Sequence, residues 1–219
     1  MEREVIRTAD GSTTIRLKDW DECYHSTHGA IREAYHVFIR NGLNEMPQKQ
    51  LSILEIGFGT GLNAFITALE AERLQIDIDY CGVEAYPVSS EEVHLMNYAD
   101  QVPGEHHKLF ELLHGCQWET CHRLTDNFQL TKKQMYFADI DFHNRFDLIY
   151  FDAFGFPVQP ELWTEEMFSK MFAALKSSGR LVTYAARGTI SRNLSAAGFT
   201  VGKRPGPPGK REMTVANKF

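Results

Sequence analysis

Short apolar runs alternate with helical patterns along most of the chain. The apolar runs are of strand length and are continuous or only weakly alternating, which is typical of a sheet covered on both faces. They occupy residues 51–56, 78–83, 146–151 and 180–184. Helical periodicity fills the intervals, at residues 62–72, 89–98, 161–175 and 189–197. Because parallel neighbours require crossover connections and helices provide them, the pattern predicts an α/β fold with a doubly wound, mostly parallel sheet.

Capping residues stand at the ends of several of these helices. Ser89 and Thr164 carry side-chain oxygens that can accept a hydrogen bond from the first turn of a helix. Gly179 and Gly198 stand where helices are expected to stop, because glycine tolerates the left-handed backbone of a helix end.

The two ends of the chain carry antiparallel signals. Runs with β propensity at residues 4–6 and 13–17 flank Asp10-Gly11, a dipeptide that supplies the positive φ angles of a tight turn. We therefore expect an N-terminal β-hairpin. Residues 199–202 and 212–216 are expected as two closing strands around a loop rich in proline and glycine.

Length and composition exclude several classes of protein. The chain has 219 residues, of which 43% are hydrophobic and 24% charged, as in an ordinary soluble domain. No run approaches the roughly 18 apolar residues that span a bilayer, and the N-terminus lacks the features of a signal peptide. The four cysteines form no C-x-x-C pair, and the nine histidines show no convincing metal-binding spacing. We therefore expect a single domain in a reducing cytoplasm, with no membrane segment and no metal.

Charge is distributed unevenly along the chain. Residues 1–175 hold 14 Lys and Arg against 28 Asp and Glu, whereas residues 176–219 hold 9 Lys and Arg against 1 Glu. The C-terminal part therefore has a balance of +8 in a chain whose net charge is −6. Such a basic segment indicates a local surface for a polyanion. A solvated basic face without a partner is the alternative at this point.

The sharpest motif is a glycine-rich turn at the end of the first predicted core strand. The strand runs into Gly57, Gly59 and Gly61 and then into a helix. Glycine at this edge of the sheet lets a ligand lie against bare backbone. The spacing Gly59-x-Gly61-x-x-Ala64 also satisfies a loose form of the dinucleotide-binding fingerprint. Spacing alone therefore leaves two classes of cofactor open.

Four acidic residues stand near the ends of predicted strands and favour one of these classes. Glu55 precedes the glycines, Glu84 ends the second core strand, Asp139 follows residues 136–138, and Asp152 follows the strand at 146–151. A carboxylate at position 55 suits a cationic ammonium and would repel a pyrophosphate. A carboxylate at position 84 can accept hydrogen bonds from both hydroxyls of a ribose.

This arrangement resembles the class I S-adenosylmethionine-dependent methyltransferases. In that class an acid before the glycines, an acid after the second strand and an acid after the third hold the cofactor. The resemblance implies a Rossmann-like core, which we assign to residues 51–219. Residues 1–50 are then an N-terminal extension that carries the hairpin, and the whole chain, 1–219, is one methyltransferase domain.

A closer resemblance rests on several motifs in order from about residue 20 to the end. They are Phe58-Gly-Thr-Gly-Leu-Asn63, Val83-Glu-Ala-Tyr-Pro87, Phe151-Asp-Ala-Phe154, Pro160-Glu-Leu-Trp163 and Lys210-Arg-Glu-Met213. The combination is similar to the methyltransferase domain of the MnmC-type tRNA modification enzymes. It implies N-methylation of 5-aminomethyl-2-thiouridine at the tRNA wobble position, which gives 5-methylaminomethyl-2-thiouridine.

The resemblance also implies roles for individual residues. S-adenosyl-L-methionine is expected to be held by Glu55, Gly57, Gly59, Gly61, Asn63, Glu84, Asp139 and Tyr24. Asp152 is the candidate catalytic residue, which orients the substrate amine and accepts or relays its proton. The tRNA, gripped at the anticodon stem-loop, is expected to contact Phe154, Lys203, Arg204, Lys210 and Arg211.

Two other interpretations differ in class. The loose dinucleotide spacing is compatible with a nicotinamide-dependent oxidoreductase. The basic C-terminal part is compatible with a non-catalytic RNA-binding module that retains a relic cofactor pocket. Because 219 residues leave no room for the flavin-dependent oxidase domain of many MnmC-type enzymes, we expect only the methylating step here, with a separate FAD-dependent oxidase acting upstream.

Overall fold

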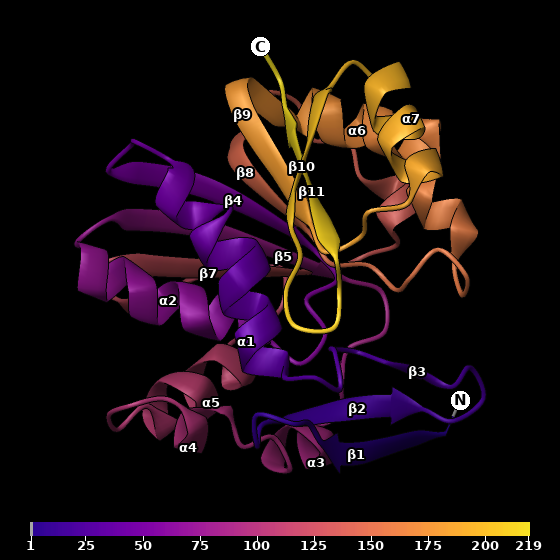
Figure 1. Cartoon of the computed structure of the whole chain (residues 1–219). Helices are drawn as coiled ribbons and strands as arrows, with labels where there is room; N and C mark the ends of the chain where they lie inside the picture. Colours follow the sequence, from indigo (N-terminus) through magenta and orange to yellow (C-terminus); the bar gives the residue numbers. More distant parts are fainter. Residues whose placement is uncertain (1) are drawn as a thin grey trace.

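The computed structural model describes residues 2–219 and contains an eight-stranded sheet with helices on both faces (Figure 1). The strands run in the order β10-β11-β9-β8-β4-β5-β7-β6 across the sheet. In that order they are Thr200–Pro205, Glu212–Asn217, Leu175–Thr183, Phe146–Phe151, Gln50–Ile56, Asp77–Glu84, Phe128–Gln134 and Cys121–Thr125. The neighbours from β9 to β7 are parallel, whereas β10, β11 and β6 pair antiparallel. The predicted doubly wound, mostly parallel α/β sheet is thereby confirmed.

The direction of winding reverses between β4 and β8. The chain proceeds from β4 to β5 and β7 on one side, and β8 and β9 lie on the other side of β4. Open α/β folds bind ligands in the crevice at the carboxyl ends of such strands. The predicted glycine-rich turn and Asp152 both follow strands at this crevice.

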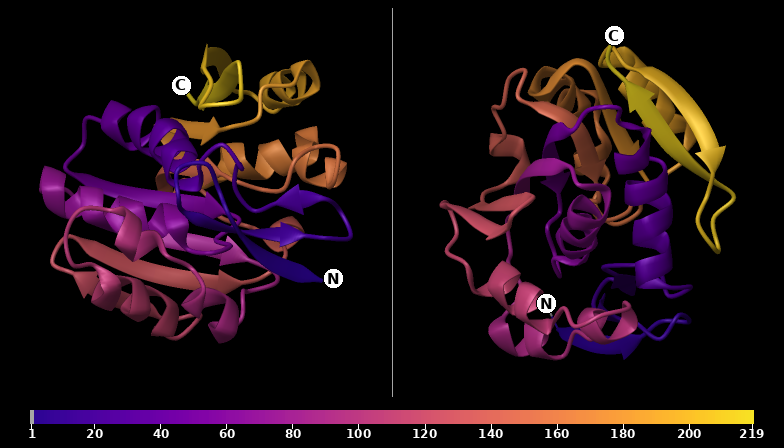
Figure 2. Two further views of the ribbon diagram at one scale, coloured as in Figure 1. Left: turned by 60° about the horizontal axis from the view of Figure 1, so that its bottom comes forward. Right: turned by 90° about the vertical axis from the view of Figure 1, so that its left-hand side faces the viewer.

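Side chains alternate between the two faces of the sheet and build two cores. Leu51 and Ile53 point toward the face covered by the segment 30–40 and α2, whereas Leu54 and Ile56 point toward the opposite face. The first face is covered by α1 (Ala30–Ala34), a π-helical segment (Tyr35–Arg40) and α2 (Leu62–Leu74), with α4 (Tyr98–Gln101) and α5 (His107–Gly115) beyond α2. The second is covered by α6 (Glu165–Ala174) and α7 (Gly188–Ala196) (Figure 2).

A small separate sheet lies across the carboxyl edge of the large one. It comprises β1 (Arg3–Arg7), β2 (Thr13–Leu17) and β3 (Glu22–Cys23), and β1 and β2 form the predicted hairpin with Gly11 at a φ of 87°. Asn97 ties it to the core region beyond α3 (Ser90–His94), because the Thr13 backbone N–H donates to Asn97 Oδ1 at 2.8 Å. The tip of the β10–β11 hairpin approaches the same edge from the other side (Figure 1).

Several predicted element ends are confirmed. The Ser89 hydroxyl accepts from the Glu92 N–H in a complete capping box, and the Thr164 hydroxyl accepts from the Met167 N–H at 3.3 Å. Gly198 follows α7 with a φ of 105°.

The prediction for Gly179 is wrong. The helix ends at Ala174 and β9 begins at Leu175, so Gly179 lies within a strand. Leu175 is fully buried and pairs with Phe146 at the edge of β8, which draws the backbone into extended structure sooner than the helical pattern indicates. The predicted helix over residues 89–98 is likewise interrupted, with α3 ending at His94 and α4 starting at Tyr98. Within residues 2–219, none of the helices is long and apolar enough to cross a membrane.

Candidate active site

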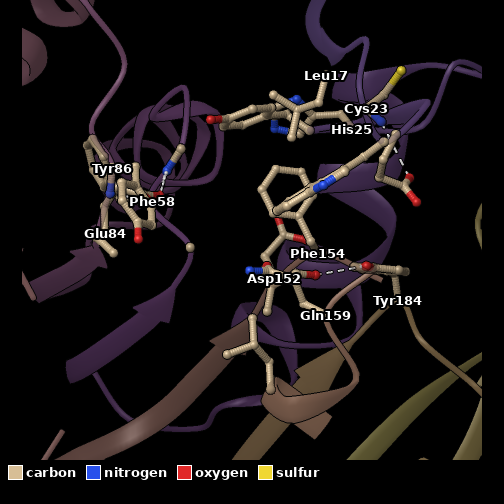
Figure 3. Close-up of a pocket in the computed structure, with 18 of the residues that line it drawn as sticks. Leu17, Cys23, His25, Phe58, Glu84, Tyr86, Asp152, Phe154, Gln159 and Tyr184 are labelled. Carbon is tan, nitrogen blue, oxygen red and sulfur yellow. Dashed lines mark hydrogen bonds between the residues drawn. The ribbon is translucent and has the colours of Figure 1, made fainter. Parts of the chain in front are cut away.

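A cavity of about 1130 Å³ opens at the carboxyl ends of β4, β5 and β8, beneath the N-terminal sheet. Its walls come from the glycine-rich turn, the segments after β5, β7 and β8, the small sheet, and the β10–β11 loop. Figure 3 shows one end of the cavity with Phe58, Glu84 and Tyr86, the other end with Asp152, Phe154 and Tyr184, and above them Leu17, Cys23 and His25.

The glycine-rich turn is built so that backbone faces the cavity. Gly57 has a φ of 92° and Gly59 a φ of 48°, a region that side chains with a Cβ rarely adopt. A Cβ on Gly57 would lie 2.6 Å from the carbonyl oxygen of Asp152, and one on Gly59 would lie 3.0 Å from the Tyr24 ring. Both glycines line the cavity, as does Asn63 in the first turn of α2. The turn therefore offers a cradle that only glycine can form.

Gly61 allows close packing between helices and does not line the cavity. It has a φ of 71°, and a Cβ at this position would lie 2.8 Å from the Leu113 side chain and 2.9 Å from His114. Glycine here lets α2 begin close against α5. Its predicted contact with the cofactor stays a prediction, since Gly61 is not among the residues that line the cavity.

Glu84 ends β5 and lines the cavity beside the glycine-rich turn. One carboxylate oxygen accepts from the Gly59 N–H at 3.0 Å and the other accepts from the Tyr86 N–H at 2.9 Å. Each oxygen keeps a further lone pair for a hydroxyl donor. The strand end thus presents a fixed carboxylate to the cavity, and its predicted role as a ribose ligand stays a prediction.

Asp152 follows β8 and lies at the opposite end of the cavity (Figure 3). Its Oδ2 accepts from the Asn63 amide at 2.8 Å. Burial, reinforced by the negative charge of Glu33, raises the pKa of Asp152 to about 7, against the opposing effects of the Asn63 hydrogen bond and Lys210. A carboxylate with this pKa exchanges protons near neutral pH, which an ordinary aspartate does not.

Glu55 lies behind this wall and not in it. Its side chain is fully buried, and both carboxyl oxygens lack a hydrogen-bond partner within residues 2–219. Burial, followed by the charge of Asp152, raises the pKa of Glu55 well above its usual value. Its placement does not support the predicted attraction of a carboxylate for a cofactor ammonium, because the β4 pleat turns the side chain under α2.

Three aromatic rings form a further part of the cavity wall. The Tyr24 and Phe154 rings meet edge to face with centroids 5.0 Å apart, and Trp20 meets Phe154 on another side at 6.0 Å. All three line the cavity, and Trp20 is 39% exposed at its rim. The sequence predicts Tyr24 as a cofactor ligand and Phe154 as an RNA contact, and both roles stay predictions. Trp20 is not predicted, because nothing in its local pattern distinguishes it.

The segment after β7 lines the cavity through different residues from the predicted one. Tyr136, Phe137 and Ala138 contribute to the wall. Asp139 ends the 3₁₀ turn Phe137–Asp139, is exposed, and does not line the cavity. Its role in binding the cofactor stays a prediction.

The four predicted basic residues of the β10–β11 hairpin, two in β10 and two in the loop, do not form one exposed surface. Lys210 turns inward, where its ammonium pairs with Glu33 and lies 3.9 Å from the centroid of the Tyr184 ring. Lys203 donates to the Ala186 carbonyl oxygen at 2.6 Å and to the Thr214 hydroxyl. Arg204 and Arg211 are exposed and form no ion pair with the residues that the structure describes. The predicted phosphate surface is therefore best provided by the two arginines.

The cavity is strongly acidic. Six carboxyl side chains line it and only two basic ones, Arg3 and Lys210. The carboxyl groups belong to Asp21, Glu22, Glu33, Glu84, Asp152 and Glu161. His25 adds no charge, since burial lowers its pKa to about 4. Glu33 and Tyr184 were not predicted as site residues, because α1 and the end of β9 meet Asp152 only in the folded chain. Among residues 2–219, no group of three or more His, Cys, Asp and Glu side chains could hold a metal ion.

The sheet order, the crevice and the glycine cradle define a class I methyltransferase fold of the Rossmann-like type. The profile of the family described as "S-adenosyl-L-methionine-dependent methyltransferase" matches residues 105–219, and the chain belongs to this family. S-adenosyl-L-methionine is therefore its cofactor. The methyltransferase interpretation is confirmed over the nicotinamide-dependent oxidoreductase, for which Gly59-x-Gly61-x-x-Ala64 was the sole support.

Individual relatives are more specific. The chain is 31% identical to the tRNA 5-methylaminomethyl-2-thiouridine biosynthesis bifunctional protein MnmC of Cupriavidus metallidurans, over 97% of this chain and 33% of that protein. The MnmC protein of Ralstonia nicotianae is 30% identical over 90% of this chain and 32% of its own length. The chain thus spans about a third of these relatives.

Two solved structures share the fold. The MNMC2 protein of Aquifex aeolicus superimposes with a TM-score of 0.81 at 25% identity, covering 98% of this chain and 70% of that one. Spermidine synthase from Thermotoga maritima superimposes with a TM-score of 0.61 at 16% identity, covering 99% and 69%. The first is similar in sequence as well as in fold, and the second in fold alone.

The residues present fit the cofactor. The cradle at Gly57 and Gly59 leaves space that a Cβ would fill, and the Glu84 carboxylate stands beside it at the strand end. Asp152 adjoins Gly57 through its backbone, and its side chain lies apart from Glu84 in the cavity (Figure 3). Gly57, Gly59 and Glu84 would hold the cofactor, and the same cavity has acidic and aromatic walls.

Proposed function

We propose that the chain methylates the primary amine of 5-aminomethyl-2-thiouridine at the tRNA wobble position, using S-adenosyl-L-methionine. The observation that carries the proposal is Asp152, a carboxyl group with a pKa of about 7 in an acidic, aromatic cavity beside the glycine cradle. The similarity to MnmC proteins supports the choice of RNA substrate. We assign Gly57, Gly59, Asn63 and Glu84 to the cofactor and Asp152 to the amine.

The charge of the cavity favours a cationic substrate. A primary alkylamine resembles the lysine side chain, whose pKa is about 10.4, so it arrives as an ammonium ion. Six carboxyl groups against two basic side chains attract such a group. The same field would disfavour an anionic or oxyanionic acceptor.

The raised pKa of Asp152 matters because the ammonium must lose a proton before it can attack. Transfer from a group of pKa about 10.4 to an ordinary aspartate is uphill by about 9 kcal/mol. With Asp152 at about 7, the same transfer is uphill by only about 4 to 5 kcal/mol. The Asn63 amide holds Oδ2, which fixes the carboxylate and leaves Oδ1 to receive the proton.

Bound S-adenosyl-L-methionine supplies a methyl group on a sulfonium, whose thioether leaves without needing an acid. The remaining work of the protein is to place the amine in line with that methyl group and to keep water out. The rings of Tyr24, Phe154 and Trp20 are suited to hold the base beside Asp152, since nucleobases stack on aromatic side chains. Asp152 then orients the amine and takes its proton.

A single-turnover assay tests the proposal. Purified protein is mixed with S-adenosyl-L-methionine and tRNA bearing the aminomethyl group, and the nucleosides are identified by mass spectrometry. The proposal expects one methyl group on the wobble nucleoside. A protein that binds the tRNA but transfers no methyl group would instead support the non-catalytic RNA-binding module.

A further inference from the structure

A lysine of the protein itself lies in the substrate end of the cavity. Lys210 comes from the β10–β11 loop, and its ammonium forms an ion pair with Glu33 of α1. The same ammonium lies 3.9 Å from the centroid of the Tyr184 ring. The second carboxylate oxygen of Glu33 accepts from the Ser26 N–H at 2.8 Å, so the carboxylate is fixed.

These partners are the ones that recognise a primary ammonium group. A carboxylate supplies charge and acceptors, and an aromatic face attracts a cation within about 6 Å of its centroid. The end of a lysine side chain is a methylene carbon that carries an ammonium, as is the aminomethyl group of the proposed substrate. Lys210 therefore has the chemistry of the substrate group that the cavity is proposed to receive.

The subsite adjoins the proposed catalytic carboxylate. Tyr184 donates to the carbonyl oxygen of Ala153 at 2.8 Å, directly after Asp152 in the chain. Glu33 and Lys210 both act electrostatically on Asp152, in opposite directions. An ammonium held at Glu33 thus lies in the same cavity as Asp152 and within the range of its charge.

We propose that Glu33 and Tyr184 form the ammonium subsite of the substrate, and that Lys210 is a resident cation which the substrate displaces. The inference rests on the proposed function for the identity of the incoming amine. It makes Glu33 and Lys210 determinants of specificity, distinct from the catalytic Asp152.

Displacement also gives Lys210 a second partner. Its loop includes Gly209, whose φ is 84°, and the exposed Arg211, and the exposed Arg204 lies near the end of the adjoining strand β10. Once released from Glu33, the Lys210 ammonium can join these arginines at an RNA phosphate. A free aminomethyl nucleoside displaces Lys210 from Glu33 and provides no phosphate for the displaced ammonium. An aminomethylated RNA places its own ammonium at Glu33 and provides a phosphate for Lys210. Recognition of the amine is thereby coupled to recognition of the RNA backbone.

The test uses the free nucleoside 5-aminomethyl-2-thiouridine, which has no phosphate, and measures its affinity calorimetrically for the full chain saturated with S-adenosylhomocysteine. Lys210→Met should bind the nucleoside about tenfold more tightly than the unaltered protein, because nothing has to be displaced. Glu33→Gln should bind it about tenfold more weakly. Lys203→Met is the matched control on the same hairpin and should leave the affinity unchanged. Unchanged or weakened binding by Lys210→Met would overturn the inference.

A measurement on the unaltered protein covers the case in which a variant fails to fold. In ¹⁵N-lysine NMR spectra the Lys210 ammonium signal, assigned by its loss in Lys210→Arg, should move when the aminomethyl nucleoside is added. It should stay in place with 2-thiouridine, which lacks the amine. If the Lys210 signal does not move when the aminomethyl nucleoside is added, the displacement of Lys210 is contradicted. The methyl-transfer assay on tRNA is scored separately, so an inactive protein that shows this exchange would refute the proposed function and leave the ammonium subsite standing.

Discussion

Asp152 is the residue on which the proposed chemistry depends most. Its raised pKa of about 7 predicts that kcat/KM rises with pH through neutrality, as the carboxyl group becomes able to accept a proton. Asp152→Asn keeps the shape and removes the basic group. Turnover should fall at least 100-fold, on the scale of general-base catalysis, while cofactor affinity changes far less. Equal losses of turnover and of cofactor affinity would make Asp152 a cofactor ligand only.

The same residue links stability to pH. Because the folded-state pKa of Asp152 lies above its value of 3.8 in the unfolded chain, the folded protein binds the extra proton more tightly. The stabilisation of the folded state by the proton on Asp152 is therefore present below about pH 4 and is lost as the pH rises to about 7. Asp152→Asn should be more stable than the unaltered protein at pH 8, by on the order of 4 kcal/mol, and nearly equal to it at pH 4. Urea unfolding at the two pH values measures this, and an Asn variant that is less stable at pH 8 contradicts the account.

Glu84 tests the assignment of the cofactor's ribose. Glu84→Ala removes a carboxylate acceptor and should weaken S-adenosyl-L-methionine binding by about 1.5 to 3 kcal/mol, the range for hydrogen bonds to charged groups. Because Glu84 also accepts from the Gly59 and Tyr86 N–H groups, Glu84→Gln serves as the control that keeps size and one acceptor. Calorimetric affinity unchanged in the Ala variant would refute the ribose assignment.

Much of the site was predictable because parallel strands end at one edge of a sheet. Glu84, Asp152 and the glycine-rich turn follow β5, β8 and β4, and all of them line one cavity. Glu55 does not line this cavity, because the pleat of β4 directs its side chain toward α2. The inward position of Lys210 could not be predicted either. The local sequence shows a positive charge, but its partner Glu33 is 177 residues away in the chain.

At the scale of elements, the turn between β4 and α2 carries the strictest geometric demand. Gly57→Ala would place a Cβ 2.6 Å from the Asp152 carbonyl oxygen at a φ of 92°. We expect the free energy of unfolding to fall by about 1 to 3 kcal/mol. We expect the affinity for S-adenosyl-L-methionine to fall by a larger fraction than the stability does. Gly202→Ala in β10 is the control, since the nearest atom to its Cβ would lie at 3.9 Å. Thermal unfolding and calorimetry check both, and a Gly57→Ala variant that binds normally would show that the cradle is not required.

Hydrophobic periodicity predicts best the central strands, whose side chains are buried on both faces of the sheet. The strands at residues 51–56, 78–83 and 146–151 lie in the centre of the sheet, where both faces are covered, and were predicted within a residue or two. The hairpin of β6 and β7 was missed, because this edge region mixes polar and apolar residues. Leu175 was assigned to a helix because its helical period continues from α6, and its pairing with Phe146 overrides that signal.

At the scale of the whole molecule, the basic C-terminal part contributes one lysine, Lys210, to an acidic cavity. Since Lys210 and Lys203 are engaged within the protein, Arg204 and Arg211 are the residues best placed for phosphates. Replacing both with Ala should weaken tRNA binding and flatten the slope of log affinity against log salt by up to about 2 units. Cofactor affinity should not change. An unaltered salt slope would remove the loop from the RNA-binding surface.

The covering of the cavity is a property of the assembled chain. The N-terminal sheet and the β10–β11 hairpin come from opposite ends of the sequence, and both contribute walls to the cavity at the carboxyl edge of the large sheet. Local patterns predicted both hairpins correctly. Their position over the cavity could not be predicted, because it depends on contacts such as Thr13 with Asn97 and Lys210 with Glu33.

The most direct test of the central claim is the transfer of a methyl group to the wobble nucleoside. Aminomethylated tRNA is incubated with the protein and isotopically labelled S-adenosyl-L-methionine, and its nucleosides are separated and weighed by mass spectrometry. The account predicts labelled 5-methylaminomethyl-2-thiouridine with the unaltered protein, little with Asp152→Asn, and none on tRNA that lacks the aminomethyl group. Label on another nucleoside, or none at all from a protein that binds both the cofactor and the tRNA, would contradict it.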